Sequence, residues 1–426
     1  MKIFDQIKKA CLLPAVFAVS LTACNKLELE PTPNPAATQG TTPTLATLLD
    51  APEFSLLKVL AVRAKLYSTL EIPSLRFTIF APDNAAIIAS LGVPDEATAA
   101  AYLGSLSDAA VTGLVSYHVI PQAVNSSSIS NSFPNLPYPT ILNPAPSVSP
   151  LLRLTTSPSV RSNGAWVNNI PIIATDIVAV NGVMHKVARI VSPPSRPLWE
   201  RIATDTELTF LKAAIQRADS GTTATAGTLN PNNLQSVLTE FGPNLTVFAP
   251  IDDALKALLY AKAYPAIYQQ LYEGAYANAI TAGATPEQAA GIATGYATAN
   301  APATTTALTS SPAVFQNPAF FGPLDAQTVK GLIVYHILGS RAFSVNFPMT
   351  ATNTPTLLNA AIPTHPGISI AATFTGPIVT AATVKGVGNA TAADIAINPT
   401  PNPNGTSDQH FINGVLHKIS RVLLPQ

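Results

Sequence analysis

One six-residue stretch occurs twice in this chain, and it constrains the fold more than any other feature. Asn-Gly-Val-Met-His-Lys at residues 181–186 returns as Asn-Gly-Val-Leu-His-Lys at residues 413–418. In each copy the Asn-Gly pair predicts a tight hairpin turn with positive φ angles, and the alternation that follows is typical of a half-buried strand. A proline comes soon after each strand, at Pro193 and at Pro425. Two such copies indicate an internal duplication, so we expect two related domains in tandem.

Two further blocks repeat in the same order. Phe-Thr-Ile-Phe-Ala-Pro at residues 77–82 matches Leu-Thr-Val-Phe-Ala-Pro at residues 245–250, and each predicts a short buried strand that ends at its proline. The acidic and amide residues that follow (Asp83 and Asn84, then Asp252 and Asp253) are placed to cap a helix N-terminus. Residues 113–120 and 331–338 each carry a helical run that ends in a Tyr-His pair.

These three blocks, in this order and twice over, resemble the fasciclin (FAS1) domain. The family has a Thr-Val-Phe-Ala-Pro pattern, a central Tyr-His pair, and an Asn-Gly-Val-x-His box followed by Leu-x-Pro, and the resemblance covers nearly all the chain after about Thr44. It implies an α+β fold in which a wedge or sandwich of β-strands has helices packed alongside. The residues that match the motifs, for which we expect a structural role, are Phe80, Ala81, Pro82, Tyr117, His118, Asn181, Gly182 and His185, then Phe248, Ala249, Pro250, Tyr335, His336, Asn413, Gly414 and His417.

The repeat also sets expected domain boundaries. We place a first fasciclin-like domain at residues 44–194 and a second at residues 195–426. About fifty more residues separate Phe248 from His336 than separate Phe80 from His118, which predicts a helical insertion at about residues 257–322. A second enlarged segment, rich in Thr, Pro, Asn and Gly, is expected to be a loop at about residues 348–408. Insertions of this length are usually functional or disordered rather than part of a core.

The predicted insertion carries tyrosines at every fourth residue, namely Tyr260, Tyr264, Tyr268, Tyr272 and Tyr276. On a helix, successive rings in such a series lie about 40° apart. Pro265 predicts a break in this helix or the start of a new one. We expect most of the stripe to be buried with one end exposed. The alternative is an exposed strip for sugar rings or a partner protein, for which the candidates are Tyr264, Tyr268, Tyr272 and Tyr276. Residues 285–288 then form a capping box that begins a second, Ala-rich helix.

The N-terminus predicts export and a lipid anchor. Lys2, Lys8 and Lys9 precede an apolar segment at residues 10–21 that is too short to span a bilayer as a helix. Leu-Thr-Ala-Cys at residues 21–24 resembles the lipobox of bacterial lipoproteins, so residues 1–24 are expected to be a signal peptide with Cys24 as the acylated first mature residue. The alternative is an ordinary signal peptide with an incidental cysteine. Residues 25–43 predict a flexible tether.

Anchoring and composition together indicate a compartment. Because Cys11 would be removed with the signal peptide, Cys24 has no cysteine with which to form a disulfide in the mature chain. Acyl chains such as palmitate would hold the protein on a membrane, and Asn25 directly after Cys24 favours the outer membrane, on either its periplasmic or its surface side. The chain has 23 basic and 23 acidic residues, a net charge of +0, so nothing in its composition indicates a nucleic-acid partner.

The sequence carries no pattern that is typical of catalysis. The four motif histidines lack the carboxylate-His or Cys-His spacing of metal sites, and we expect half-buried rings that hydrogen-bond to backbone groups. His365 and His410 fall in variable loops without a visible partner. Gly386-Val387-Gly388 lacks the third glycine of a nucleotide-binding loop. We therefore expect no enzyme, no cofactor and no metal.

These observations predict a non-enzymatic, lipid-anchored cell-envelope protein that acts in adhesion or in binding of an extracellular ligand. Expected partners are a matrix protein, a polysaccharide or another surface protein, in line with the adhesion and matrix-binding roles of most fasciclin domains. The alternative is an accessory glycan- or ligand-binding component of an outer-membrane uptake complex. The sequence does not name the ligand.

Overall fold

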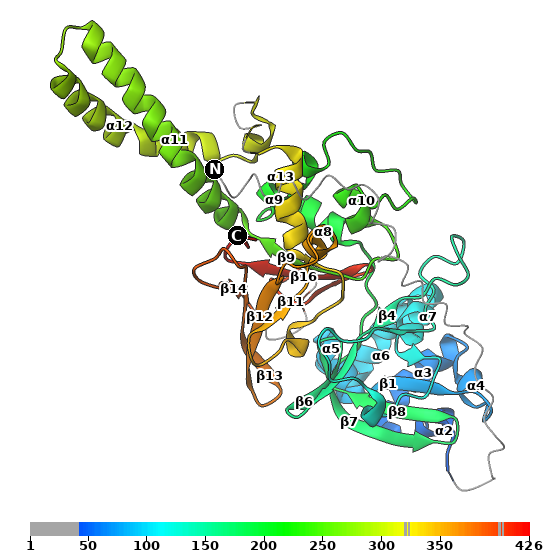
Figure 1. Ribbon diagram of the computed structural model, residues 1–426. Helices are drawn as coiled ribbons and strands as arrows, with labels where there is room; N and C mark the ends of the chain where they lie inside the picture. The colour runs from blue at the N-terminus through cyan, green and yellow to red at the C-terminus, as the bar shows by residue number, and fades with distance from the viewer. Residues whose placement is uncertain (1–41, 319–321, 323, 399–401, 403) are drawn as a thin grey trace.

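The computed structural model describes residues 42–318, 322, 324–398, 402 and 404–426. The predicted signal peptide, Cys24 and nearly all of the predicted tether lie outside these residues. Within them, none of the helices is both long and apolar enough to cross a membrane. The fold is α+β. It consists of two units that follow one another in the sequence, and each unit has its own sheet (Figure 1).

The first unit sets a layer of helices against a mixed sheet. Its helices are α2 (Leu45–Leu48), α3 (Ser55–Arg63), α4 (Tyr67–Leu70), α5 (Asn84–Leu91), α6 (Glu96–Ser105) and α7 (Asp108–Tyr117). The sheet has the strand order β2-β1-β8-β7-β6-β5, in which the strands are β1 (Phe77–Pro82), β2 (Val119–Ile120), β5 (Pro158–Arg161), β6 (Gly164–Val167), β7 (Ile170–Ala179) and β8 (Gly182–Val187). A separate ribbon pairs β3 (Tyr138–Pro139) with β4 (Thr155–Thr156).

The second unit repeats this plan. Its helices are α8 (Leu198–Thr204), α9 (Thr209–Ala218), α10 (Leu234–Thr239), α11 (Asp252–Thr281), α12 (Pro286–Thr309) and α13 (Ala326–Tyr335). The sheet order is β10-β9-β16-β14-β13-β12-β11, and β15 also pairs with β16. The strands are β9 (Leu245–Pro250), β10 (Ile337–Leu338), β11 (Thr352–Thr354), β12 (Ile368–Thr375), β13 (Ile378–Lys385), β14 (Ala393–Ile395), β15 (Gln409–Phe411) and β16 (Gly414–Ile419).

The predicted loop at residues 348–408 is wrong, because this segment supplies most of the second sheet as β11 to β14. Alternate residues of β12 point into the core, where Ile368 and Ile370 are fully buried. The residue between them is Ser369, and most of the other residues of β12 are the small Ala and Thr. That composition hid a period of two that is typical of a strand with one buried face.

The repeated Asn-Gly stretch forms a tight hairpin turn followed by a strand, as predicted, but its asparagine has a further structural role. In the first unit a two-residue turn, Val180-Asn181, joins β7 to β8, and Asn181 does not have a positive φ angle. The side chain of Asn181 is fully buried, accepts from the backbone N–H of Leu45 at 2.8 Å, and donates to the carbonyl oxygen of Leu70 at 2.7 Å. Asn181 therefore joins the β7–β8 turn to the helical layer.

Asn413 occupies the same place in the second unit. Its side-chain oxygen accepts from the N–H of Leu198 at 3.0 Å, and its amide donates to the carbonyl oxygen of Glu240 at 3.4 Å. Leu45 and Leu198 are the first residues of α2 and α8, so each asparagine satisfies a donor at the start of a helix.

The glycine of the motif is required by strand pairing. β8 runs parallel to β1, with Gly182 opposite Phe77, and β16 runs parallel to β9, with Gly414 opposite Leu245. A Cβ atom on Gly182 would lie 1.9 Å from the carbonyl oxygen of Phe77, and one on Gly414 would lie 2.3 Å from that of Leu245. No side chain fits in either place.

The helix that follows each proline is capped differently in the two units. Asp83 caps α5 through the N–H of Ala86 at 2.7 Å, as predicted. Asp252 does not cap its own helix, whose N-cap is Ile251. Its carboxylate instead accepts from the N–H of Phe210 at 2.9 Å, at the start of α9. The carboxylate of Asp252 thus caps a neighbouring helix, α9, and its position in the sequence gave no sign of this contact.

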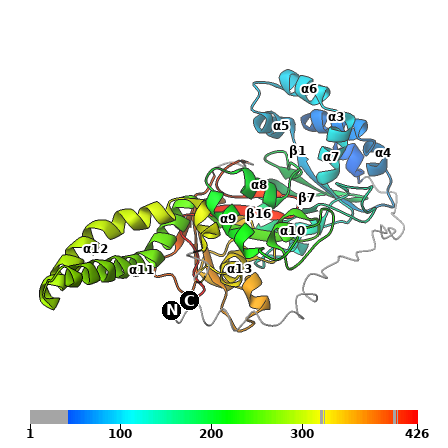
Figure 2. The ribbon, with the colours of Figure 1, turned by 90° about the horizontal axis from the view of Figure 1, so that it is seen from above.

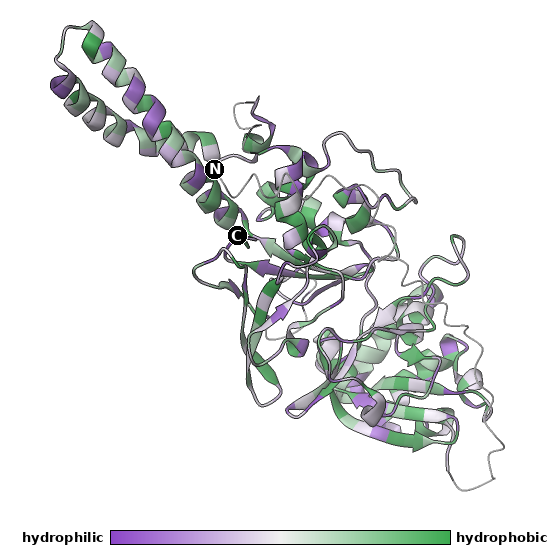
Figure 3. Ribbon diagram, in the orientation of Figure 1, coloured by the Kyte–Doolittle hydropathy of each residue, from purple (hydrophilic) through white to green (hydrophobic). Residues whose placement is uncertain are grey.

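The insertion forms an antiparallel hairpin of two long helices, α11 and α12. The hairpin projects from the second unit on the side away from the first unit (Figures 1 and 2). Hydrophilic and hydrophobic residues are interleaved along it (Figure 3). The expected break at Pro265 is wrong, since α11 is continuous through this residue. α11 packs along α12, and that packing offsets the one helical hydrogen bond that Pro265 removes.

Small residues make the close contact within the hairpin. α12 buries a stripe of alanine and threonine at every fourth position, namely Ala289, Ala293, Ala297, Ala301, Thr305 and Thr309. All five tyrosines of α11 have intermediate exposure, so none of the rings is fully buried and neither end of the row is fully exposed. The rings stack along the helix, with centroids 5.7 Å apart for Tyr260 and Tyr264 and 6.2 Å apart for Tyr272 and Tyr276.

The two units meet at the β5–β6 hairpin of the first unit. Trp166 in β6 is 1% exposed and belongs to the hydrophobic core of the second unit. Arg161 donates to the carbonyl oxygens of Asn346 and Phe347, the latter at 2.8 Å. The ring of Phe133 packs edge-on against that of Phe347 with centroids 6.0 Å apart. The interface therefore combines a buried tryptophan with a guanidinium that is bonded to backbone.

The parallel pairing of β1 with β8 gives the first prediction. Gly182→Ala should lower the free energy of unfolding by about 3 kcal/mol or more, because its methyl group would overlap the backbone of β1. Chemical denaturation followed by circular dichroism measures this change. The matched control is Gly113→Ala in α7, where a Cβ meets open space and should stabilise the helix by about 0.5–1 kcal/mol. Equal effects of the two substitutions would contradict the steric account.

Candidate functional site

The motif histidines form two kinds of contact, and each kind occurs once in each unit. The first kind is at the C-terminal end of α7 and of α13. His118 Nδ1 lies 2.8 Å from the carbonyl oxygen of Leu114, and its Nε2 accepts from the N–H of Val191 at 3.0 Å. His336 repeats the arrangement with the carbonyl oxygen of Leu332 at 2.8 Å and the N–H of Leu423 at 2.9 Å. Both rings therefore carry their proton on Nδ1 and are neutral.

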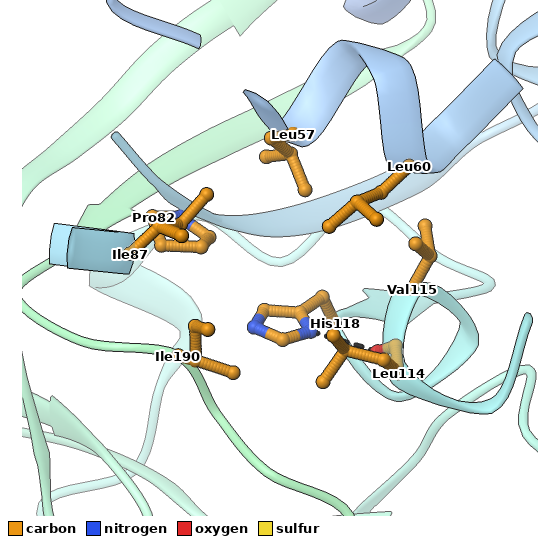
Figure 4. Close-up of a pocket in the computed structure, with 8 residues that line it drawn as sticks. All are labelled: Leu57, Leu60, Pro82, Ile87, Leu114, Val115, His118 and Ile190. Atoms are coloured by element: carbon orange, nitrogen blue, oxygen red, sulfur yellow. Dashed lines mark hydrogen bonds between the residues drawn. The ribbon is translucent and has the colours of Figure 1, made fainter. Parts of the chain in front are cut away.

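The surroundings of His118 are closed and apolar. Figure 4 shows Leu57, Leu60, Pro82, Ile87 and Ile190 around its ring, together with the hydrogen bond to Leu114. The space that remains is about 10 Å³, which is no larger than one water molecule needs. Burial lowers the pKa of His118 to about 4, and that of His336 likewise to about 4. This space is a packing gap beside a neutral histidine and has no room for a substrate.

The second kind of contact involves the strand histidines. His185 Nδ1 accepts from the N–H of Asp176 at 3.2 Å, and its Nε2 lies 2.9 Å from the carbonyl oxygen of Val124. His417 Nδ1 accepts from the N–H of Asp408 at 3.3 Å, and its Nε2 lies 3.0 Å from the carbonyl oxygen of Ala342. These rings carry their proton on Nε2, and burial lowers the pKa of both. Both are fully buried.

Each strand histidine has an aspartate and a serine beside it, which the sequence analysis missed. The N–H and the hydroxyl of Ser344 both donate to the carboxylate of Asp408, at 2.6 Å each. The N–H of Ser126 donates to Asp176 at 2.7 Å, and its hydroxyl donates to the same carboxylate. Both aspartates have positive φ angles, 59° for Asp176 and 52° for Asp408, which aspartate tolerates better than most residues. The signal in the sequence was an aspartate nine residues before each strand histidine.

The Ser–Asp–His group is not arranged for nucleophilic catalysis. A catalytic base must accept a proton from the serine hydroxyl, and the carboxylate must orient the base. Here the serine hydroxyl donates to the carboxylate, while both ring nitrogens of the histidine bond to backbone atoms. The group joins three segments of each unit and leaves no nucleophile activated.

The remaining histidines have partners that their sequence positions did not show. His365 Nε2 lies 2.9 Å from the carbonyl oxygen of Pro425, and its Nδ1 accepts from the N–H of Gly367 at 3.0 Å. His410 lies in β15 rather than in a loop, and its Nε2 is 2.6 Å from Nη1 of Arg341. Across the part of the chain that the structure describes, no three His, Cys, Asp or Glu side chains are grouped as metal ligands.

Other motif residues complete the framework. Phe80 stacks on His185 and Phe248 stacks on His417, with ring centroids 5.7 Å apart in both units. Ala81 and Ala249 are fully buried in the strands that end at Pro82 and Pro250. The hydroxyl of Tyr117 donates to the carbonyl oxygen of Thr155 at 2.9 Å, and that of Tyr335 donates to the carbonyl oxygen of Gly367 at 2.7 Å. These side chains connect helix, sheet and loop inside each unit.

The glycines at 386 and 388 pack against the C-terminal segment. A Cβ on Gly386 would lie 2.6 Å from the carbonyl oxygen of Leu424, and one on Gly388 would lie 2.0 Å from that of Gln426. They are needed where two stretches of backbone touch, and this explains them without a nucleotide.

The candidate binding tyrosines lie apart from these networks, on the projecting hairpin. Tyr264, Tyr268, Tyr272 and Tyr276 each keep part of the ring accessible. On the second helix Ile292 and Tyr296 are 55% and 50% exposed. The structure therefore separates two groups of residues, a buried motif that supports the fold and an accessible aromatic row on the hairpin.

The buried helix histidines predict a pH dependence of stability. An unfolded histidine binds a proton near pH 6.5, whereas folded His118 and His336 bind one only near pH 4. The unfolded state therefore binds more protons between these values, and stability should be complete above about pH 6.5 and fall as pH is lowered toward 4. The loss should be about 3 kcal/mol for each histidine. Urea unfolding at several pH values measures it, and His118→Gln should flatten the slope. An identical slope in this variant would contradict the assignment.

Comparisons with known proteins agree with the geometry of the first unit. The model of the fasciclin domain matches residues 52–193. No curated protein matches the chain. Among solved structures, the chain is similar to a FAS1 domain pair from the insect cell adhesion molecule fasciclin I, at 12% sequence identity and a TM-score of 0.30, over 89% of this chain and 95% of that one. The second unit repeats the central strands and the histidine contacts of the first. The chain thus contains a fasciclin domain at residues 52–193, and this domain is followed by a second unit with the same order of central strands.

Proposed function

We propose that this protein is a non-enzymatic adhesion protein of the cell envelope, held on the membrane by lipid at Cys24, which binds an extracellular matrix component through its projecting helical hairpin. Fasciclin domains are associated with cell adhesion and are generally non-catalytic. The buried contacts of the motif histidines support the same conclusion, because those rings hold backbone segments together and face no substrate.

The hairpin is the observation that carries this proposal. It extends away from both units (Figures 1 and 2), so a partner can approach it without displacing either sheet. Its tyrosines present partly exposed rings with hydroxyl groups, and neighbouring rings lie against one another along the helix. Such rings offer an apolar surface with a polar tip, which suits sugar rings and protein side chains alike.

The rival function is an accessory, glycan-binding role beside an outer-membrane uptake system. The tyrosine row favours this glycan-binding role, because sugar rings stack on aromatic rings. Binding of a soluble oligosaccharide, together with no attachment to coated surfaces, would favour the rival over adhesion.

The anchor gives a prediction that is independent of the hairpin. If Cys24 is acylated, Cys24→Ser should move the protein from the membrane pellet to the soluble fraction after detergent-free fractionation. Metabolic labelling with an alkynyl fatty acid should mark the parent protein and not the variant. Equal labelling and unchanged membrane association would remove the lipid anchor from this account.

The hairpin gives a second prediction. Tyr268→Ala combined with Tyr272→Ala should cost only about 1–2 kcal/mol of stability, because both rings are half-buried, and should reduce attachment by tenfold or more. The assay measures retention of protein-coated beads on a glycan array and on collagen- and fibronectin-coated surfaces. Tyr102→Ala is the matched control, since Tyr102 is 50% exposed on α6 of the first unit. Attachment that is unchanged in the double variant would exclude the hairpin as the binding surface.

A further inference from the structure

A cleft lies where the end of the first unit passes over the second. It encloses about 330 Å³ and is lined by residues of the segment after β8, by Asn168 and Asn169 of the first unit, and by Asp408 and His410 of the second. A second hollow of about 230 Å³ shares Asn169, Arg189 and Asp408 with it. The two hollows are therefore adjoining parts of one groove, and their combined space is in the range of small-ligand sites.

Positive charge dominates this groove, although the chain as a whole is neutral. Arg189 and Arg196 line the larger hollow, and the buried Arg341 lies directly behind His410. The only carboxylate among the residues that line the two hollows belongs to Asp408. It already accepts two hydrogen bonds from Ser344, at 2.6 Å each. The groove thus has an excess of cationic groups, which favours an anionic ligand.

Several hydrogen-bond donors in the groove have N–H groups that can bind a ligand. Arg189 uses one of its five N–H donors on the carbonyl oxygen of Ala89, at 3.1 Å. The side-chain amide of Asn169, which borders both hollows, makes no hydrogen bond within the described part of the chain. His410 accepts at Nε2 from Arg341, so its proton lies on Nδ1 and can be donated. A carboxylate can accept hydrogen bonds from guanidinium, amide and imidazole donors together, which is the combination that these residues offer.

The rim indicates what carries the carboxylate. Ser192 and Ser195 are exposed beside the cleft and offer hydroxyl groups, and Asn402 adds an amide. Pro193 and Pro194 between the serines present flat apolar faces. A sugar ring that bears several hydroxyl groups and one carboxylate matches this lining. Its hydroxyl groups suit the serines, its apolar face suits the prolines, and its carboxylate suits the arginines.

We propose that the groove between the two units binds a uronic acid residue of an acidic saccharide, with Arg189 and Asn169 holding its carboxylate. The groove is separate from the hairpin, and the site operates whether or not the hairpin carries adhesion.

The test uses the full chain in detergent micelles and a matched pair of sugars. Calorimetric titration with tri-galacturonate should show saturable binding, and neutral galactotriose should bind at least tenfold more weakly, because it carries hydroxymethyl groups in place of the carboxylates. Affinity for the acid should fall as salt is raised from 50 to about 500 mM, since charge contributes to binding. Arg189→Gln should weaken binding tenfold or more. The charge-matched control is Arg153→Gln, because Arg153 bonds only to carbonyl oxygens of its own loop, outside the groove.

Four results would overturn the proposal. They are equal binding of the two sugars, no saturable binding of the acid at millimolar concentration, unchanged binding in Arg189→Gln, and equally tight binding of a Glu-containing tripeptide, which would assign the groove to a peptide carboxylate.

Asn169→Ala provides a second test if Arg189→Gln fails to fold. Its amide has no partner in the described protein, so the variant should melt as the parent does and bind the acid more weakly. A chain that lacks residues 266–309 should still bind, which separates this site from the proposed adhesion surface.

Discussion

Parallel pairing between the first and the last strand of each unit is the constraint on which the rest of the structure depends. β1 pairs with β8, and β9 pairs with β16, although the paired residues lie more than a hundred positions apart in the chain. Glycine at positions 182 and 414 permits the close approach, and the neighbouring asparagines connect the same strands to the helical layer. The lysines that follow add charge pairs, with Lys186 bonded to Asp83 at 2.8 Å and Lys418 to Asp205 at 2.6 Å. The repeated stretch therefore closes each unit.

The histidines complete this closure in a way that keeps them neutral. One histidine of each unit joins the end of a helix to the segment after the last strand, and the other joins the last strand to two further segments, which are β7 and the loop at Val124 in the first unit. Every ring nitrogen in these contacts has a backbone partner, so protonation would remove an acceptor and place a charge in an apolar interior. At neutral pH these hydrogen bonds hold the loops of each unit in one arrangement. Because both nitrogens of each ring are already bonded, neither can act as a general base. Binding functions are left to the surfaces outside the two cores.

Much of the architecture could be predicted from sequence because the motif residues occur twice in the same order. The strand before Pro82, the helix that ends in Tyr117-His118 and the Asn-Gly strand are all present. The pairing partners could not be predicted, because local patterns do not specify which distant strand lies alongside. For the same reason the sequence placed Asn181 in a turn but did not show that its buried side chain also accepts a hydrogen bond from the start of α2. The strands within residues 348–408 were missed because Ala and Thr mask their alternation. The tyrosine row was expected to be buried, and the small residues of α12 instead supply the tight contact and leave the rings at its edge.

The central claim is that the four motif histidines are neutral structural residues with fixed and opposite tautomers. Nitrogen-15 NMR of the imidazole rings tests it directly, because the shifts of Nδ1 and Nε2 report which nitrogen is protonated. At pH 6.5 the account predicts a proton on Nδ1 for His118 and His336 and on Nε2 for His185 and His417. The signals should not change when zinc is added. Rings that are charged at this pH, that exchange between tautomers, or that shift with metal would contradict the account and reassign the motif to chemistry.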